Sequence, residues 1–398
     1  MQRWGGRMAG WRERLAAAAN RIEVPLDVVR VRFWLRRGWL DSVSVVVYRG
    51  YGTPTMLRLR GRVISRRAIV SATSTDSVWR NLRGMYRRFT GLEIPGATVH
   101  VRFADDPGPP VAATTDDEGF FIVEHTLPTA GPGWREATVE LHAPLIRRQR
   151  VARATGQVLV PPPEAAFGVI SDIDDTIVRT NATSLLTMAR VVLLGNAHTR
   201  LPFLGAAAFY RALEAGVGGR DGNPLFYVSS GPWNLYDVLI EFLALNEIPA
   251  GPLFLQDWGL GPRKLFKIGH REHKLGVIAT LLADYPALPF VLIGDSGEQD
   301  AEIYRDAARA HPGRIRAIYI RDTQLAHRAT AVRTIAEELR AGTTPLLLVS
   351  DTVAAAEHAA AHGLIDPDTL PAIRTDKVRD TPRSPQATWR QFLRRWRR

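Results

Sequence analysis

Three carboxylates crowd into four positions directly after an apolar stretch. Residues 167–171 read Phe-Gly-Val-Ile-Ser, and Asp172, Asp174 and Asp175 follow. Like charges this close repel one another, so such a run either faces water or is offset by a cation. The apolar stretch predicts a central parallel strand, and open α/β sheets bind their ligands at the carboxyl ends of such strands. Oxygen ligands without histidine or cysteine indicate Mg²⁺ rather than zinc.

Two later apolar stretches also end in polar side chains. One leads into Ser229, Ser230 and Gly231, where backbone N–H groups at a predicted helix start suit an anion. The other leads into Asp295, with Asp300 a few residues further on. Each group of polar residues is therefore expected at a strand end, where chemistry on a phosphate is feasible.

Lysine is rare and clustered in this arginine-rich chain. Only four lysines occur, and three of them, Lys264, Lys267 and Lys274, fall within eleven residues. Such clustering indicates that a compact ammonium is required there. Lys264 and Lys267 compete with Lys274 for that role. His270 and His273, beside Lys274, are either substrate contacts or solvated loop residues.

The spacing Asp172-x-Asp174-x-Thr176 resembles the DxDxT motif of the haloacid dehalogenase (HAD) superfamily, whose phosphatases work through an aspartyl-phosphate. The resemblance implies that Asp172 is the covalent nucleophile. Asp174 is implied to protonate the leaving oxygen and then to deprotonate the attacking water. Thr176 is implied to contact the phosphoryl group.

The remaining superfamily motifs are matched in the same order. The resemblance implies that Ser229, with the N–H groups of Ser230 and Gly231, binds the phosphoryl oxygens. Lys274 is implied to neutralise charge on the phosphoryl group and on the nucleophile. The Mg²⁺ ligands implied by the resemblance, direct or through water, are Asp172, Asp174, Asp295 and Asp300.

A closer resemblance covers residues of about 165–325. The runs 171–176, 227–235, 273–274 and 294–300 are similar to those of the fungal actin-patch phosphatidate phosphatases and their bacterial relatives. This family implies Mg²⁺-dependent conversion of phosphatidate to diacylglycerol, and hence a role in lipid metabolism. The fungal actin-binding region has no match here, so its partners are not implied.

The short distance between the first two motifs leaves no room for a large cap domain. About fifty residues separate Thr176 from Ser229, and a predicted helix at 203–216 and the next strand use half of them. The rest, at 179–202, suffices for a flap. A minimal cap leaves the site open to a bulky substrate: a protein, a nucleic-acid end or a lipid headgroup.

The elements around these motifs predict two architectures. Residues 41–160 alternate apolar and polar positions in short runs between turns, which indicates an all-β sandwich, similar to transthyretin-like or carboxypeptidase-regulatory domains. From 161 to 365, strand and helix patterns alternate, which predicts a Rossmann-like parallel sheet of α/β class, the HAD-like phosphatase domain. A basic helical segment at 1–40 and a basic tail at 366–398 are expected to flank them.

Composition limits the partners and the cellular location that we expect for this chain. The net charge of +12 favours polyanionic partners, unless it only reflects a genome's preference for arginine. The chain has no cysteine, so disulfides and thiolate sites are excluded. No apolar run is long enough to span a membrane. We expect a cytoplasmic protein in peripheral contact with an anionic membrane, with a phosphorylated lipid as substrate and no nucleic-acid partner.

Overall fold

The computed structural model describes residues 42–65, 93–145, 151–173, 205–256, 269–340 and 342–380. Contacts divide the chain into two units, each considered by itself. The first unit comprises Met1–Pro163, Ser229–Asp237 and Gly251–Tyr285. The second unit comprises Glu164–Val228, Val238–Ala250 and Pro286–Arg398.

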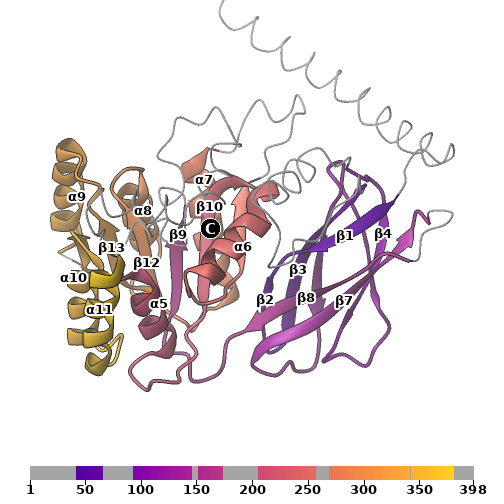
Figure 1. The fold of residues 1–398 in the computed structure, drawn as a ribbon, viewed down its shortest axis with the longest axis horizontal. Helices are drawn as coiled ribbons and strands as arrows, with labels where there is room; N and C mark the ends of the chain where they lie inside the picture. The colour runs from indigo at the N-terminus through magenta and orange to yellow at the C-terminus, as the bar shows by residue number, and fades with distance from the viewer. Residues whose placement is uncertain are drawn as a thin grey trace, which may run out of the picture. The chain divides into compact units, whose positions relative to one another are not determined.

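The first unit contains an eight-stranded sheet with the order β1-β3-β2-β8-β7-β4-β5, in which β6 also pairs with β3. Its strands are β1 (Val43–Val47), β2 (Gly50–Thr53), β3 (Met56–Ser65), β4 (Thr98–Phe103), β5 (Val111–Thr114), β6 (Phe120–Thr126), β7 (Gly133–Ala143) and β8 (Arg153–Val160). The pairs are antiparallel except for β2 and β8, which run parallel. The predicted all-β region is confirmed (Figure 1).

Alternation along β3 explains how this sheet builds a core. Leu57, Leu59 and Val63 point inward and are fully buried, while Arg58, Arg60 and Arg62 are partly exposed. Val99 of β4 and Val139 of β7 belong to the same apolar cluster. Strands from both ends of the sheet order therefore share one core, so the sheet closes over itself as a sandwich does.

The second architecture is a six-stranded sheet with the order β11-β10-β9-β12-β13-β14. Its strands are β9 (Gly168–Asp172), β10 (Leu225–Pro232), β11 (Leu253–Gln256), β12 (Phe290–Asp295), β13 (Ile315–Arg321) and β14 (Leu346–Val349). From β10 to β14 each neighbouring pair runs parallel. Every residue of β12 is buried, as expected of a strand covered on both faces. The predicted parallel α/β sheet is confirmed.

Helices alternate with these strands, as the sequence predicted. They are α5 (Ala206–Ala215), α6 (Tyr236–Leu245) after the short helix η1 (Trp233–Leu235), α7 (His270–Asp284), α8 (Asp300–Ala310), α9 (Ala326–Leu339) and α10 (Thr352–Ala361). Figure 1 shows α8, α9 and α10 beside β12 and β13. Among the helices that the structure describes, none has the length and apolar composition required to cross a membrane.

One helix was not predicted. The segment read as a tail from 366 contains η3 (Pro367–Thr369) and α11 (Leu370–Asp380). Ile373 of α11 is fully buried, and Lys377 donates to the Asp351 carboxylate over 2.6 Å. Only a narrow stripe of α11 is buried, so most of its residues are polar. The sequence therefore lacked the apolar periodicity that would have predicted a helix here. The predicted basic segment at 1–40, the flap at 179–202 and the end of the tail lie outside the described residues.

Candidate active site

Asp172 is the last residue of β9, the strand between β10 and β12. The strand pairs Ser171 with Tyr227 of β10 and with Ile293 of β12. The four residues before Asp172 are buried, and Asp172 itself is half-buried. The ladder on both sides fixes the backbone of Asp172, so its carboxylate stands at the carboxyl edge of the sheet, as predicted.

Asp295 ends β12, the adjacent strand, and is 5% exposed. One of its carboxylate oxygens, Oδ1, accepts from the backbone N–H of Gly297 at 2.6 Å. Asp300, at the start of α8, is fully buried, and its Oδ2 accepts from the backbone N–H of Asp295 at 3.1 Å. Asp300 therefore fixes the loop that carries Asp295. The Asp300 carboxylate fits there because Gly294, which it contacts, has no side chain.

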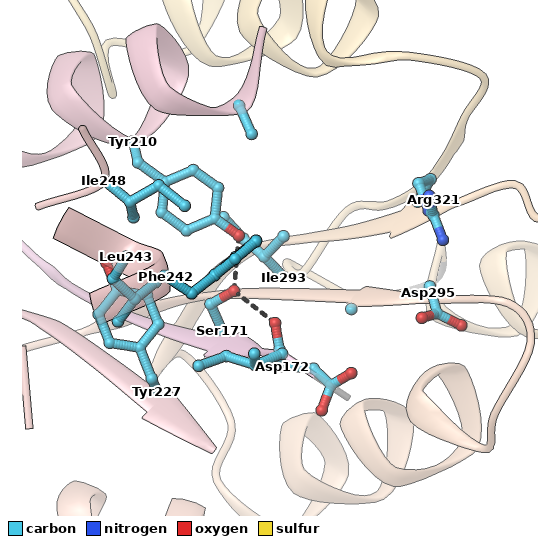
Figure 2. A pocket seen from close by; sticks show the side chains of 13 residues that line it. Ser171, Asp172, Tyr210, Tyr227, Phe242, Leu243, Ile248, Ile293, Asp295 and Arg321 are labelled. Carbon is cyan, nitrogen blue, oxygen red and sulfur yellow. Dashed lines mark hydrogen bonds between the residues drawn. The ribbon is translucent and has the colours of Figure 1, made fainter. Parts of the chain in front are cut away.

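These strand ends line one cavity of about 40 Å³. Asp172 and Asp295 both line it, with Arg321 from the end of β13. Figure 2 shows Asp295 and Arg321 at one side of the view and the apolar groups at the other. The apolar lining includes Tyr210, Phe242, Leu243, Ile248 and Ile293. The cavity therefore has an acidic end and an apolar end.

Tyr210 of α5 supports the strand end beneath Asp172. Its hydroxyl shares a 2.6 Å hydrogen bond with Ser171 Oγ, which also donates to the Asp172 carbonyl over 3.0 Å (Figure 2). Burial, and to a smaller extent the nearby Asp172 carboxylate, raise the pKa of Tyr210 to about 12. The phenol stays neutral at physiological pH and acts as a fixed hydrogen-bonding group.

Sequence reasoning missed Tyr210 and Arg321. Arg321 pairs with Asp295 in the β12–β13 ladder, so it stands at the same edge as the predicted carboxylates. A signal for it existed, because a charged residue ends the predicted buried strand at 315–320. Tyr210 had no such signal, since an aromatic residue on a helix face is ordinarily part of the core.

The first unit holds the predicted phosphate-binding residues. Ser229, 2% exposed, follows Val228, the β10 residue paired with Asp172. The N–H of Gly231 donates to Ser229 Oγ over 2.9 Å, and Ser230 Oγ is hydrogen-bonded to His270 Nδ1. This 229–231 segment therefore presents hydroxyls and backbone amides within the last residues of β10.

Lys274 lies on α7, one helical turn after His270, and is 1% exposed. Residues four apart share a face of a helix, so the Ser230–His270 contact places Lys274 on the face that meets the end of β10. His273 Nε2 lies 3.4 Å from the Phe254 carbonyl oxygen. Burial lowers the pKa of His273, which favours the neutral imidazole.

The structure thus gathers the predicted residues in two groups. Asp172, Asp295 and Asp300 belong to the second unit, and Ser229, Ser230, Gly231 and Lys274 belong to the first. Asp174 and Thr176 lie outside the described residues, as do Lys264 and Lys267. Roles assigned to those four remain predictions.

The donor set at the cavity fits a hard divalent cation. Asp172 and Asp295 contribute carboxylate oxygens from adjacent strand ends. Neither histidine nor cysteine is among the residues that line the described cavity. Mg²⁺ prefers such oxygen ligands together with water and substrate phosphate. The residues present therefore suit the predicted metal.

The fold and site define a parallel α/β protein with an acidic ligand site at the carboxyl edge of its sheet. Residues 167–322 match the family model described as phosphatidate phosphatase APP1, catalytic domain. The resemblance of residues about 165–325 to the fungal actin-patch phosphatidate phosphatases is confirmed. The matched domain is that of a phosphomonoesterase.

Two fungal proteins are similar to this chain. Phosphatidate phosphatase APP1 of Saccharomyces cerevisiae is 36% identical over 156 residues, which cover 39% of this chain and 26% of the yeast protein. An uncharacterized protein of Schizosaccharomyces pombe is 26% identical over 213 residues, which cover 52% of this chain and 34% of that protein. The chain thus aligns with about a quarter to a third of the length of these relatives.

Similarity to solved structures is weak. The CARDB domain of a Pyrococcus furiosus protein matches with a TM-score of 0.17 and 10% identity, covering 30% of this chain and 94% of that chain. A likeness at this level carries no argument about fold or function.

Proposed function

We propose that the chain is a Mg²⁺-dependent phosphatase of the HAD type that converts phosphatidate to diacylglycerol through an aspartyl-phosphate. The observation that carries this proposal is the pair of carboxylates, Asp172 and Asp295, at adjacent strand ends around one cavity. The match of residues 167–322 to a phosphatidate phosphatase catalytic domain supports the same substrate.

Each residue has a role in the proposed reaction. Asp172 attacks phosphorus, and the P–O bond to the leaving alcohol breaks. Asp174 gives that oxygen its proton and then removes one from the water that hydrolyses the aspartyl-phosphate. Ser229 and the amides of Ser230 and Gly231, with Thr176, bind the phosphoryl oxygens. Lys274 offsets their charge with its buried ammonium.

Asp172, Asp174 and Asp295 would hold the metal, with Asp300 in support. When bound, Mg²⁺ neutralises charge on the phosphoryl oxygens and on the nucleophile. The hydrogen bonds from Gly297 to Asp295 and from the Asp295 N–H to Asp300 orient the acidic loop for this purpose. Loss of such outer contacts commonly costs about 10- to 100-fold in metal affinity or activity.

Access to a lipid headgroup at a membrane surface is part of the proposal. The net charge of +12 suits an anionic interface, where each basic residue near the surface contributes about 1 kcal/mol. The basic aromatic segments at both ends of the sequence are the candidate contacts, and they lie outside the described residues. The protein would then be a peripheral enzyme on the cytoplasmic side.

The test is phosphate release from phosphatidate in mixed micelles, with and without Mg²⁺. Wild type is expected to release phosphate only with the metal. Asp172→Asn should reduce turnover by at least about 1,000-fold with an unchanged circular dichroism spectrum, because the amide is not a nucleophile. Equal turnover in the variant would contradict the assigned nucleophile.

A second candidate keeps the chemistry and changes the substrate. An aryl phosphate hydrolysed in a Mg²⁺-dependent manner, with phosphatidate untouched, would favour a phosphoprotein, a nucleic-acid end or another phosphomonoester. The open site predicted from the short spacing between motifs accommodates any of these. No hydrolysis of any phosphomonoester by wild type would leave a non-enzymatic role for the chain.

A further inference from the structure

Three arginines on one face of β3 reach the segments that carry the predicted phosphate-binding residues. Arg58, Arg60 and Arg62 alternate with buried positions along the strand, so all three point away from the β-sheet core. Their contacts lie within the first unit, in Ser229–Asp237 and at the end of α7. We call these three residues the arginine row.

Arg62 makes the most directed contact. Its Nη1 donates to Asn234 Oδ1 over 2.9 Å, three residues after Gly231. Its Nε donates to the Glu118 carbonyl over 2.9 Å, and Nη2 pairs with the Glu93 carboxylate. The guanidinium is 12% exposed and therefore held in one orientation. Such a fixed fork can position Asn234 at little further cost in entropy.

Arg60 contacts two aromatic rings, one from each segment it joins. Its Cζ is 4.4 Å from the ring centroid of Phe120 on β6 and 4.5 Å from that of Trp233. Tyr48 packs against the same segment: its ring centroid is 4.4 Å from that of Trp233 and 4.6 Å from that of Tyr236. Cation–π and aromatic contacts therefore hold the turn after Gly231, in addition to the hydrogen bonds.

Arg58 holds the helix that carries Lys274. Its Nη1 pairs with the carboxylate of Asp284, the last residue of α7, which also accepts from Tyr51 OH over 2.9 Å. The neighbouring Tyr285 hydroxyl donates to the Gly52 carbonyl over 2.9 Å. The same strand face therefore contacts the end of the helix whose beginning carries His270 and Lys274.

We propose that Arg62 is a positioning residue for phosphate binding. Through Asn234 it fixes the 229–231 segment, while the rest of the arginine row fixes Trp233 and α7. The β-sheet domain then serves the proposed reaction by holding the anion-binding groups of Ser229–Gly231 and Lys274 in register with each other. This inference rests on the proposed phosphatase function, and it assigns that domain a task within the same reaction.

The experiment compares Arg62→Met with wild type and with Arg135→Met. Arg135 is the matched control, because it pairs with Asp105 in the same β-sheet domain. Steady-state kinetics on phosphatidate micelles would be combined with inhibition by inorganic phosphate. For Arg62→Met we expect KM and the inhibition constant for phosphate to rise about tenfold, with a smaller fall in kcat. Arg135→Met should leave both constants unchanged.

Hydrogen exchange supplies a readout that does not depend on turnover. Amides of 229–237 should exchange faster in Arg62→Met than in wild type, and those in Arg135→Met should not. If Arg62→Met fails to fold, Arg62→Lys replaces it, since the ammonium keeps a charge beside Glu93 but lacks the fork that reaches Asn234.

The outcomes separate this inference from the function beneath it. Unchanged exchange at 229–237 with an unchanged phosphate inhibition constant would overturn the role of Arg62, even in an active enzyme. Wild type that hydrolyses no phosphomonoester would refute the phosphatase proposal, and the exchange comparison would then decide alone whether Arg62 positions the segment.

Discussion

Asp172 and Asp295 end two neighbouring strands and are held by backbone pairing. The turn that follows residues 229–231 is held instead by side chains from the eight-stranded sheet of the first unit. The ladder pairs β9 with β12 residue by residue up to Ser171 and Ile293. The contact between Arg62 and Asn234, by contrast, joins residues 172 apart in the sequence. The acidic half of the predicted residues, Asp172 and Asp295, is therefore held by backbone pairing between strands. The anion-binding half, residues 229–231 with Lys274, depends on side-chain contacts as well.

Within the anion-binding half, the largest effect should come from removing the buried charge. Lys274→Met is expected to lower kcat/KM by about 100- to 1,000-fold, because a preorganised charge on the phosphoryl group is lost. Lys274→Arg should also lose most of the activity, since a guanidinium fork does not reproduce the compact ammonium. Kinetics on phosphatidate micelles measure both.

Lys377→Met provides the control for this comparison, because Lys377 pairs with Asp351 on a helix that carries none of the assigned roles. Its kcat/KM should match that of wild type. Near-wild-type activity in Lys274→Met would remove Lys274 from the reaction.

The acidic half can be disturbed by a single methyl group. A Cβ at Gly294 would lie 2.3 Å from Asp300 Oδ2 and 2.8 Å from Asp300 Cβ. Gly294→Ala should therefore displace the loop of Asp295 and reduce kcat by about 100-fold, with a higher Mg²⁺ concentration needed for half-maximal rate. Titration of the rate with Mg²⁺ tests this, and Gly276→Ala, where a Cβ would meet nothing within 4 Å, is the control.

Hydrogen-bond deletions distinguish the stabilities of the two units. Tyr236→Phe removes the acceptor for the Arg49 N–H at 2.7 Å in the first unit, and Tyr227→Phe removes the donor to the Pro249 carbonyl at 2.7 Å in the second. Each should lower the free energy of unfolding by about 1 kcal/mol. Urea unfolding followed by hydrogen exchange should assign each loss to its own unit. Losses spread equally over both units would contradict the division of the chain.

The smallest effect concerns pH. Burial lowers the pKa of His273, so the unfolded chain takes up a proton at about pH 6.5 that the folded chain resists. The free energy of unfolding should therefore fall as pH drops from about 7 to 5.5. His273→Gln should weaken this dependence, measured as denaturant midpoints at the two pH values. A variant of the exposed His327 on α9 should not, and equal slopes in all three proteins would rule out His273 as the cause.

Sequence periodicity was sufficient to predict both sheets. Alternation in β3 and the apolar runs of β9 and β12 are local signals, and polar residues at strand ends predicted the positions of Asp172, Ser229 and Asp295. The contacts of Arg62, Tyr210 and Arg321 could not be predicted in this way. Each depends on which distant segments come together, and local spacing carries no record of such pairing. The motif Arg58-x-Arg60-x-Arg62 was visible, but its targets were not.

The packing of Trp233 and Tyr236 against Tyr48 limits where the chain can be cut. Sequence similarity draws its boundary at 167–322, whereas packing assigns Ser229–Asp237 to the unit that begins far upstream. In this structure Trp233 and Tyr236 are each 7% exposed. A fragment confined to residues 167–322 would expose both rings to solvent and remove the hydrogen bond from Arg62 to Asn234. Such a fragment should aggregate and have low activity, although it retains every motif. The smallest active fragment of this chain should therefore be longer than the region of sequence similarity.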